Sequence, residues 1–374
     1  MTSGARAQVR LDAVRANAEF LRTVVPGCKL MATVKANAYG HGLVPVAEEL
    51  SGADALAVAR LVEAKRLRAS GIETPIVLLG GATTDNELKQ AVTLNCTLVI
   101  HGMAQVELIE QSKLPVGRVW LKVDTGMHRL GIRPSAVSEA LERLAATQRI
   151  ERVGLMTHMA NADTPGDPMT RRQLDGFVAL TKGFDGDISI ANSALLLANP
   201  EELADRGRWG HTGDMWVRPG ISLYGISPFP GRVGASMGLR PVMQFEAALI
   251  DVKTIARGEP VGYGGTWSAP RETVIGIVSA GYGDGYSRFL PSGTPVLVNG
   301  RRAPVVGSIS MDLTTVDLGP DAKDKVGDRV VLWGDGLPVE EIAGLAETIP
   351  YTLVSGITDR AHRWRKREVR AEHA

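Results

Sequence analysis

The arrangement of apolar positions divides the chain into two parts near residue 230. In the first part, short apolar runs of strand length alternate with longer amphipathic stretches of helical period. Strands separated by helices predict right-handed βαβ units and a parallel sheet. Eight such units in roughly 200 residues favour a closed (β/α)8 barrel over an open sheet. The expected strands are residues 30–35, 53–59, 75–81, 96–102, 118–124, 152–158, 187–192 and 215–224.

The second part has a different pattern, in which β-type runs follow one another with few helices. The change begins in the Gly- and Pro-rich segment 228–240. We therefore expect an α/β protein with an N-terminal TIM-like (β/α)8 barrel over residues 11–230 and a C-terminal, mostly antiparallel β domain over residues 238–374. Residues 1–10 precede the barrel pattern and could join either domain. The β-type runs are 245–255, 273–280, 294–298, 303–306 and 329–333, with one helix at 339–348.

Composition narrows the class of protein without identifying it. The 374 residues are 44% hydrophobic, and 42 basic side chains balance 41 acidic ones, so no global field favours a nucleic-acid or membrane partner. Neither a signal pattern nor an apolar run of about 18 residues occurs, and we expect a cytoplasmic protein. Cys28 and Cys96 lack ligand spacing, so we expect neither a disulfide nor a metal site. The basic segment 359–370 is expected to be a solvated C-terminal end.

Lys35 is the most informative single residue, because an apolar run at 30–34 ends abruptly on it. Buried lysines are costly unless they are paired or modified. A lysine whose charge is suppressed by burial is a nucleophile that can form a Schiff base with a carbonyl. The alternative is a strand-end lysine in a salt bridge, which position alone favours.

The other strand ends carry polar residues that a barrel would bring to one rim, where barrel active sites lie. Each has an ordinary explanation alone, such as a helix N-cap at Ser193 or a core histidine at His158. Together they suit a phosphorylated carbonyl cofactor, and pyridoxal phosphate fits better than a sugar phosphate, which leaves Lys35 and Arg218 less well explained. The rim candidates are Lys35, Tyr39, Lys122, Asp124, Arg129, His158, Asn192, Ser193, Arg218, Gly220 and Ile221.

Residues 34–42, Val-Lys-Ala-Asn-Ala-Tyr-Gly-His-Gly, resemble the cofactor-attachment signature of bacterial alanine racemases. Further segments resemble other elements of that family in the expected order, so the resemblance covers nearly the whole chain. These segments are 122–131, 157–163, 191–194, 218–225, 262–267, 281–285, 310–312 and 350–351.

The resemblance implies pyridoxal-phosphate-dependent interconversion of L- and D-alanine, for peptidoglycan or for alanine catabolism. It also implies a head-to-tail homodimer with shared active sites. Lys35 and Tyr263 would be the two catalytic bases, Arg129 and Met311 would bind the substrate carboxylate, and Lys122 would be a candidate for carbamylation. Tyr282 and Asp312 would lie at the entrance. The implied cofactor-binding residues are Lys35, Tyr39, His158, Asn192, Ser193, Arg218, Gly220, Ile221 and Tyr351.

Some positions depart from the family pattern, and other functions stay open. Ser310 stands where a cysteine is common, Leu313 where polar residues are frequent, and residues 356–367 differ from an Arg-Val-Pro-Arg type of ending. A serine or broad-specificity racemase and a barrel-type amino-acid decarboxylase are enzymatic alternatives. A non-catalytic pyridoxal-phosphate homeostasis protein is a barrel without a second domain, and the residues after 238 argue against it.

Overall fold

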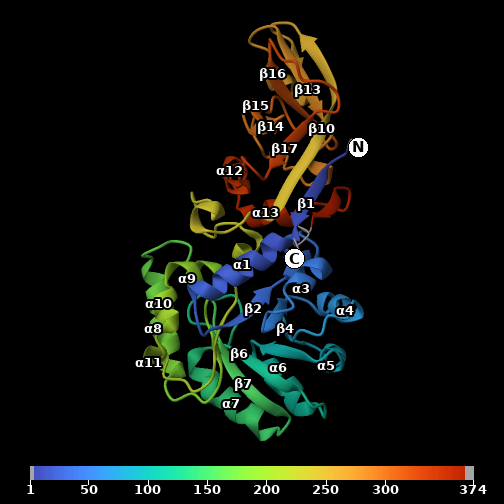
Figure 1. The fold of residues 1–374 in the computed structure, drawn as a ribbon. Helices are drawn as coiled ribbons and strands as arrows, with labels where there is room; N and C mark the ends of the chain where they lie inside the picture. Colours follow the sequence, from blue (N-terminus) through green and yellow to red (C-terminus); the bar gives the residue numbers. More distant parts are fainter. Residues whose placement is uncertain (1–3, 367–374) are drawn as a thin grey trace, which may run out of the picture.

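The computed structural model describes residues 4–366, which form a barrel with a β domain above it (Figure 1). The eight barrel strands are parallel, and the barrel closes because the first also pairs with the last. The expected fold class is confirmed. The strands are β2 (Lys29–Thr33), β3 (Ala55–Val58), β4 (Ile76–Leu78), β5 (Cys96–Ile100), β6 (Gly117–Lys122), β7 (Ile150–Met156), β8 (Ile188–Ser189) and β9 (Met215–Val217).

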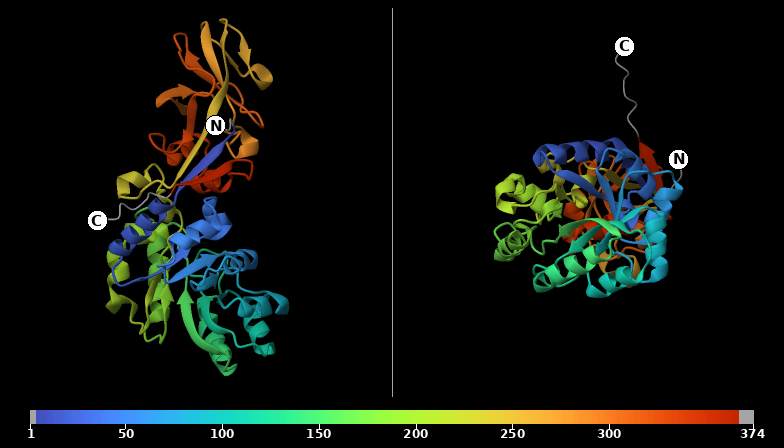
Figure 2. Two further views of the ribbon diagram at one scale, coloured as in Figure 1. Left: turned by 45° about the vertical axis from the view of Figure 1, so that its right-hand side comes forward. Right: turned by 90° about the horizontal axis from the view of Figure 1, so that it is seen from below.

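Helices surround the barrel, as the view from below in Figure 2 shows. The first of them, α1, buries Leu11, Val14 and Leu21 in a stripe at helical spacing. The barrel-part helices are α1 (Leu11–Val24), α2 (Lys35–Tyr39), α3 (Leu43–Glu49), α4 (Leu61–Ala69), α5 (Asp85–Thr93), α6 (Met103–Gln111), α7 (Val137–Ala146), α8 (Pro168–Thr181), α9 (Ser193–Ala198), α10 (Pro200–Ala204) and α11 (Arg206–Trp209). None of the helices within residues 4–366 has the length and apolarity to cross a membrane.

The barrel interior is a packed core rather than a channel. Trp120 and Trp216 meet edge to face there, with ring centroids 5.9 Å apart. Gly154 leaves the space that the Trp120 ring fills, because a Cβ on it would lie 2.6 Å from that ring. Met31, Val77 and Val99 are buried in the same cluster. This packing fills the barrel interior, and active sites of such barrels lie at the carboxyl ends of the strands.

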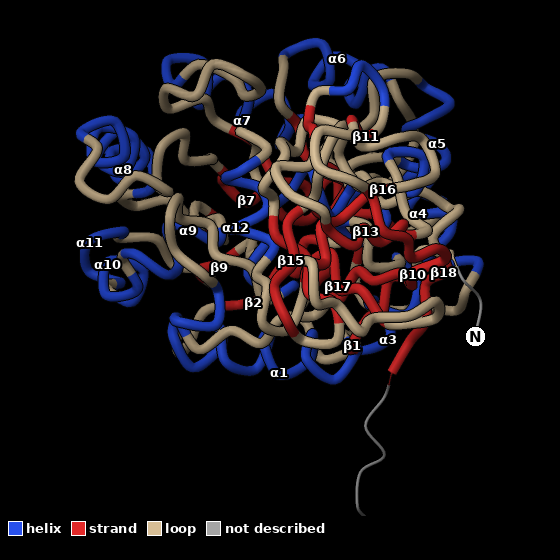
Figure 3. Tube along the Cα trace, turned by 90° about the horizontal axis from the view of Figure 1, so that it is seen from above, coloured by secondary structure: helices blue, strands red, loops and turns tan. Residues whose placement is uncertain are grey.

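The second domain is built on an eight-stranded sheet whose strands are antiparallel except where β1 pairs with β18. Seen from above, its strands lie over the barrel (Figure 3). The sheet strands are β1 (Arg6–Arg10), β10 (Met243–Ile255), β13 (Thr273–Val278), β14 (Pro295–Val298), β15 (Arg301–Pro304), β16 (Thr314–Gly319), β17 (Arg329–Trp333) and β18 (His362–Lys366). A small ribbon joins β11 (Pro260–Val261) to β12 (Trp267–Ser268), and two helices, α12 (Val339–Leu345) and α13 (Pro350–Ser355), complete the domain.

Both ends of the described chain enter this sheet. Arg6 to Val9 pair antiparallel with β10, and Arg6 to Arg10 pair in parallel with β18. Within the basic segment expected to be solvated, residues 362–366 pair with β1 as an edge strand, and Trp364 there is still 51% exposed. Residues 367–370 of that basic segment, and the ends 1–3 and 367–374 of the expected domains, lie outside the described residues.

Several strand boundaries also differ from the sequence-based expectation. The strand expected at 215–224 stops at Val217, because Pro219 has no N–H to continue a central ladder. A 3-10 turn, η2 (Ile221–Tyr224), follows it. Lys35 does not end a strand: β2 stops at Thr33, and Lys35 opens the turn of α2. The other 3-10 segments are η1 (Pro134–Ala136), η3 (Gly234–Met237), η4 (Tyr263–Gly265) and η5 (Tyr282–Asp284).

Candidate active site

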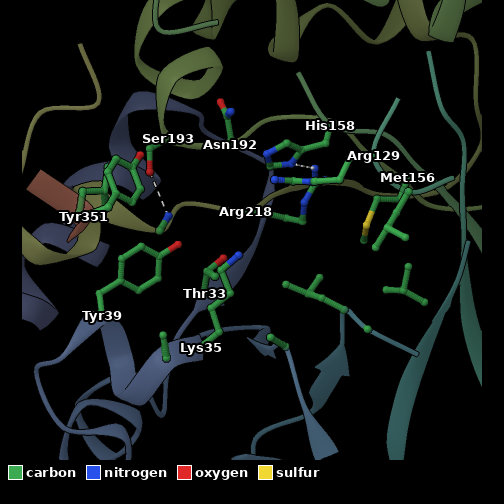
Figure 4. A pocket seen from close by; sticks show the side chains of 18 of the residues that line it. Thr33, Lys35, Tyr39, Arg129, Met156, His158, Asn192, Ser193, Arg218 and Tyr351 are labelled. Atoms are coloured by element: carbon green, nitrogen blue, oxygen red, sulfur yellow. Dashed lines mark hydrogen bonds between the residues drawn. The ribbon is translucent and has the colours of Figure 1, made fainter. Parts of the chain in front are cut away.

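A cavity of ≈ 530 Å³ lies at the carboxyl ends of the barrel strands. It is lined by residues at or near the carboxyl ends of all eight barrel strands, from Thr33, which ends β2, to Arg218, which follows β9. The close view in Figure 4 shows side chains from these elements pointing into one space. The cavity brings together eleven residues selected from the sequence: Lys35, Tyr39, Lys122, Arg129, His158, Asn192, Ser193, Arg218, Gly220, Ile221 and Tyr351.

Lys35 is presented by a left-handed turn. The next four residues, Ala36 to Tyr39, have φ values of 53°, 55°, 54° and 51°. None is glycine, and the left-handed conformation costs an L-residue roughly 1–2 kcal/mol. Gly40 follows with φ 82°, and a Cβ there would collide with the Val354 carbonyl of α13. The turn therefore depends on the fold around it, and it places both Lys35 and Tyr39 on the cavity wall.

A cup of hydrogen-bond donors forms beside Tyr39. The Ser193 Oγ accepts from the Gly220 N–H at 2.9 Å, from the Ser222 N–H at 3.3 Å and from the Ser222 hydroxyl at 2.9 Å. Asn192 caps the helix that Ser193 opens, its Oδ1 accepting from the Leu195 N–H at 3.0 Å. Backbone N–H groups and hydroxyls that converge in this way are suited to hold an anion. Ser222 is a member of this cup that the sequence reasoning missed.

Arg218 is a fixed, buried cation. Its guanidinium donates to the Ser189 Oγ at 2.6 Å, to the Thr157 and Ile190 carbonyls and to the His158 Nδ1 at 3.3 Å. Burial lowers the pKa of Arg218 to about 9, so it is still charged at neutral pH. Burial, followed by the nearby Arg218 charge, holds the pKa of His158 well below its usual value. His158 is therefore a neutral acceptor for Arg218, as Figure 4 shows.

The cavity carries a strong positive charge. Lys35, Lys122, Arg129 and Arg218 line it, and no Asp or Glu is among the described lining residues. Burial, and then the Arg129 charge, lower the pKa of Lys35. Burial and the charges of Arg218, Arg129 and Lys35 lower the pKa of Lys122 to about 8. Such a cavity favours anionic ligands and gives its lysines a larger neutral, nucleophilic fraction.

Asp124 does not line the cavity but holds the loop that carries Arg129. Its Oδ1 accepts from the Gly126 and His128 N–H groups, both at 3.0 Å, and its Oδ2 lies 3.1 Å from the His128 Nδ1. Asp124 lies just after β6, as expected, and its role is to support the loop that carries Arg129.

Aromatic rings form the wall next to the cup. Tyr39 stacks on Tyr224 with centroids 5.0 Å apart, and Tyr351 of α13 lies 5.9 Å from Tyr39. Tyr224 is fully buried and donates to the Thr33 carbonyl at 3.0 Å. It was not selected from the sequence, although it lies within the 218–225 segment. The second domain therefore reaches the cavity through Tyr351.

Four other sequence-selected residues lie outside this cavity, in what we call the exposed loop cluster, residues 262–266, 281–285 and 308–313. Tyr263 is 69% exposed and Met311 51% exposed. The loops contact one another, because the Tyr282 N–H donates to the Ser310 carbonyl at 3.1 Å and the Gly283 N–H to the Met311 carbonyl at 2.8 Å. Asp312 pairs with Arg360 at 2.7 Å. The Thr266 and Ser308 hydroxyls, 3.4 Å apart, join the loop of Tyr263 to the others, and none of the four residues lines the cavity that contains Lys35.

Cysteine and metal chemistry find little support in the described part of the chain. Burial raises the pKa of both free cysteines, Cys28 and Cys96, to about 11. Within residues 4–366, no three His, Cys, Asp or Glu side chains gather closely enough to bind a metal. The chemistry that the cavity offers is that of lysine, arginine and hydroxyl groups.

A closed barrel with an activated lysine, an anion cup and a fixed guanidinium at its rim defines a barrel enzyme for a small anionic ligand. Family models narrow the class: the alanine racemase N-terminal domain matches residues 9–228 and the C-terminal domain residues 242–365. The chain belongs to the alanine racemase family.

Relatives match over nearly the whole chain. The alanine racemase of Aeromonas hydrophila is 48% identical over 356 residues, or 95% of this chain and 97% of that protein. The crystal structure of the biosynthetic alanine racemase from Pseudomonas aeruginosa has a TM-score of 0.91 at 41% identity, covering 98% of this chain and 100% of that one. The alanine racemase from Bartonella henselae, a structure with covalently bound pyridoxal phosphate, has a TM-score of 0.86 at 28% identity, with 98% and 100% covered.

The cup depends on a missing side chain at Gly220. A Cβ there would collide with the Tyr39 hydroxyl. We expect Gly220→Ala to weaken binding of inorganic phosphate, measured by calorimetry, about ten-fold or more. Gly176→Ala in α8 is the control, because nothing lies within 4 Å of an added Cβ there. Equal affinities in the two variants would show that the cup does not hold the phosphate.

Proposed function

We propose that this protein interconverts L-alanine and D-alanine with pyridoxal phosphate as cofactor, in a homodimer with shared active sites. The observation that carries the proposal is the meeting of Lys35, the cup at Ser193 and buried Arg218 in one cationic cavity. Membership of the alanine racemase family over both domains supports it. The second domain also argues against a non-catalytic barrel protein.

The residues of the cavity fit pyridoxal phosphate. Ser193 and the N–H groups of Gly220 and Ser222 would hold its phosphate, with the Tyr39 hydroxyl next to Gly220. Lys35 would hold its carbonyl carbon, and Tyr351 would narrow the opening beside the phosphate. Asn192 and Ile221 would complete the wall. When bound, pyridoxal phosphate withdraws electrons from the amino-acid Cα and lowers the cost of removing its proton.

Arg218 would contact the ring nitrogen of the cofactor, oriented by its bonds to His158 and Ser189. With a pKa of about 9 it keeps its proton at neutral pH, so the ring nitrogen beside it would stay unprotonated. An aspartate in its place would protonate the ring and strengthen the electron sink. Arg218 would therefore limit side reactions such as transamination.

Racemisation requires a proton to leave Cα on one face and return on the other, and two bases on opposite faces meet this need. By resemblance to the family, Lys35 would serve the D-alanine face. Burial and nearby cations increase the neutral fraction of its amine, which suits the amine to act as a base. Tyr263 of a second subunit would serve the L-alanine face. The Arg129 cation in the cavity that receives it would stabilise negative charge on the Tyr263 oxygen.

The dimer would complete each cavity with the exposed loop cluster of the partner. Tyr263 and Met311 are exposed in the single chain and do not line its own cavity. The Met311 N–H and Arg129 would hold the substrate carboxylate between the subunits. Tyr282 and Asp312, in the same cluster, would border the entrance.

Purified protein loaded with pyridoxal phosphate should convert L-alanine to an equal mixture of enantiomers, because they have the same free energy. Chiral chromatography on a panel that includes L-serine would also measure substrate strictness.

We expect Lys35→Ala or Tyr263→Phe to lower the rate roughly 10²–10⁴-fold, the range for loss of a general base. Bound cofactor with no D-alanine formed would instead favour a binding protein.

Mixing the two inactive variants tests the shared site. In a reassociated mixture of Lys35→Ala and Tyr263→Phe subunits, half of the dimers are mixed, and each mixed dimer has one site with both bases. We expect recovery of about a quarter of the wild-type activity. Differently tagged subunits would verify that mixed dimers form. Mixed dimers without activity would place both bases in one subunit and contradict the arrangement.

We further propose that Lys122 carries a carbamate. Its amine nitrogen would bond to the carbon of CO2 and lose a proton to solvent, giving an anion among Lys35, Arg129 and Arg218. Only the neutral amine reacts, so with a pKa of about 8 occupancy at fixed dissolved CO2 should rise as the pH rises through that value. Native mass spectrometry should show an added CO2 that Lys122→Ala abolishes. A bare ammonium on Lys122 in a well-ordered crystal structure would refute it.

A further inference from the structure

The left-handed turn after Lys35 has a charged side chain at each end. At its start, the Ala36 N–H donates to the Glu63 Oε1 at 2.6 Å. At its end, the Gly40 carbonyl accepts from the Arg363 Nε at 3.0 Å. Neither Glu63 nor Arg363 lines the cavity, and they come from different domains, Glu63 from α4 and Arg363 from β18.

Glu63 is itself held firmly. Its Oε2 accepts from the Ala59 N–H at 2.9 Å and from the Arg60 N–H at 3.0 Å, so the carboxylate caps the start of α4 while it binds Ala36. Three backbone N–H groups thus share one carboxylate. An amide could not serve all three, because its nitrogen is a donor and has no lone pair to offer.

Arg363 is held in a similar way. Its Nη2 donates to the Ile357 carbonyl at 2.8 Å, and its Nη1 pairs with the exposed Asp359 at 3.1 Å. The planar guanidinium therefore joins Gly40 to the segment between α13 and β18. Gly40 also packs directly on the Val354 carbonyl of α13. The second domain thus supports the turn at the point where it ends.

The charges of Glu63 and Arg363 are opposite in sign to the partial charges at the ends of the turn that they bind. Aligned peptide units place partial positive charge on the N–H groups at the start and partial negative charge on the carbonyls at the end. A carboxylate at the start and a guanidinium at the end both stabilise that arrangement. This contribution opposes the unfavourable left-handed conformation of Ala36 to Tyr39.

We propose that Glu63 and Arg363 are positioning residues that hold the left-handed turn and thereby fix the Lys35 amine in the cavity. Glu63 also acts on the amine through space, since its negative charge raises the pKa of Lys35 against the effect of burial. The consequence for racemisation rests on the proposed function, but the positioning itself does not.

The test uses Glu63→Gln and Arg363→Lys, each with a matched control. Glu87→Gln is the control for Glu63, because the Glu87 carboxylate accepts from the Thr83 N–H ahead of α5, as the Glu63 carboxylate accepts from the Ala59 N–H ahead of α4. Asp359→Asn is the control for Arg363, because it removes the exposed ion pair and leaves the Gly40 bond. Two measurements use the full chain without cofactor: hydrogen exchange of the amides of residues 36–40, and the pH dependence of Lys35 acylation in competitive labelling.

We expect amide exchange in residues 36–40 to rise about ten-fold or more in Glu63→Gln and Arg363→Lys, and to stay unchanged in the controls. In Glu63→Gln the midpoint of Lys35 labelling should move to lower pH, because a negative charge is removed. In loaded protein, kcat should fall about ten-fold with little change in the KM for alanine, since Arg129 is untouched.

Exchange and labelling in Glu63→Gln equal to those in Glu87→Gln would overturn the role of Glu63. If that variant does not fold, unchanged amide exchange of residues 36–40 in Arg363→Lys would by itself overturn the proposal that these residues hold the turn. Shifts in the cofactor-free measurements combined with no racemase activity in the parent protein would leave the positioning standing and reject the proposed function.

Discussion

Four consecutive non-glycine residues in the left-handed conformation are the constraint on which the site depends. Isolated peptides do not adopt such a turn, because each residue adds unfavourable contacts between its Cβ and the backbone. It persists here since the barrel, α4 and the second domain all contact it. Glu63 binds its start, Arg363 binds its end, and α13 packs on Gly40. A turn so restrained presents Lys35 in one place.

The same region combines burial with excess positive charge. Four cationic side chains share a cavity whose described lining contains no carboxylate. Without an anionic ligand this arrangement is unfavourable, and the lowered pKa values of Lys35 and Lys122 express that cost. A phosphate in the cup and a substrate carboxylate would relieve it. Because these charges destabilise the cavity without a ligand, a doubly anionic ligand binds more favourably. The same charges make Lys35 more reactive.

Much of this architecture could be predicted from the sequence. The alternation of apolar runs and helices identified all eight barrel strands, and their ends led to Lys35, Ser193 and Arg218. Local rules missed what tertiary contacts decide. Alanines at 36 and 38 give no sign of a left-handed turn, and nothing in the sequence singled out Glu63. The strand β18 forms because β1 offers it a pairing edge. Tyr263 is exposed, so only family resemblance could suggest its role.

Reduction of the cofactor-loaded protein with borohydride, followed by peptide mass spectrometry, is the most direct measurement of the central claim. Borohydride makes a lysine–pyridoxal link permanent, so the modified residue can be identified. We expect the added mass on Lys35 alone, and none in Lys35→Ala. Attachment at Lys122, or no attachment to any lysine, would contradict the claim that the left-handed turn exists to present Lys35 to the cofactor.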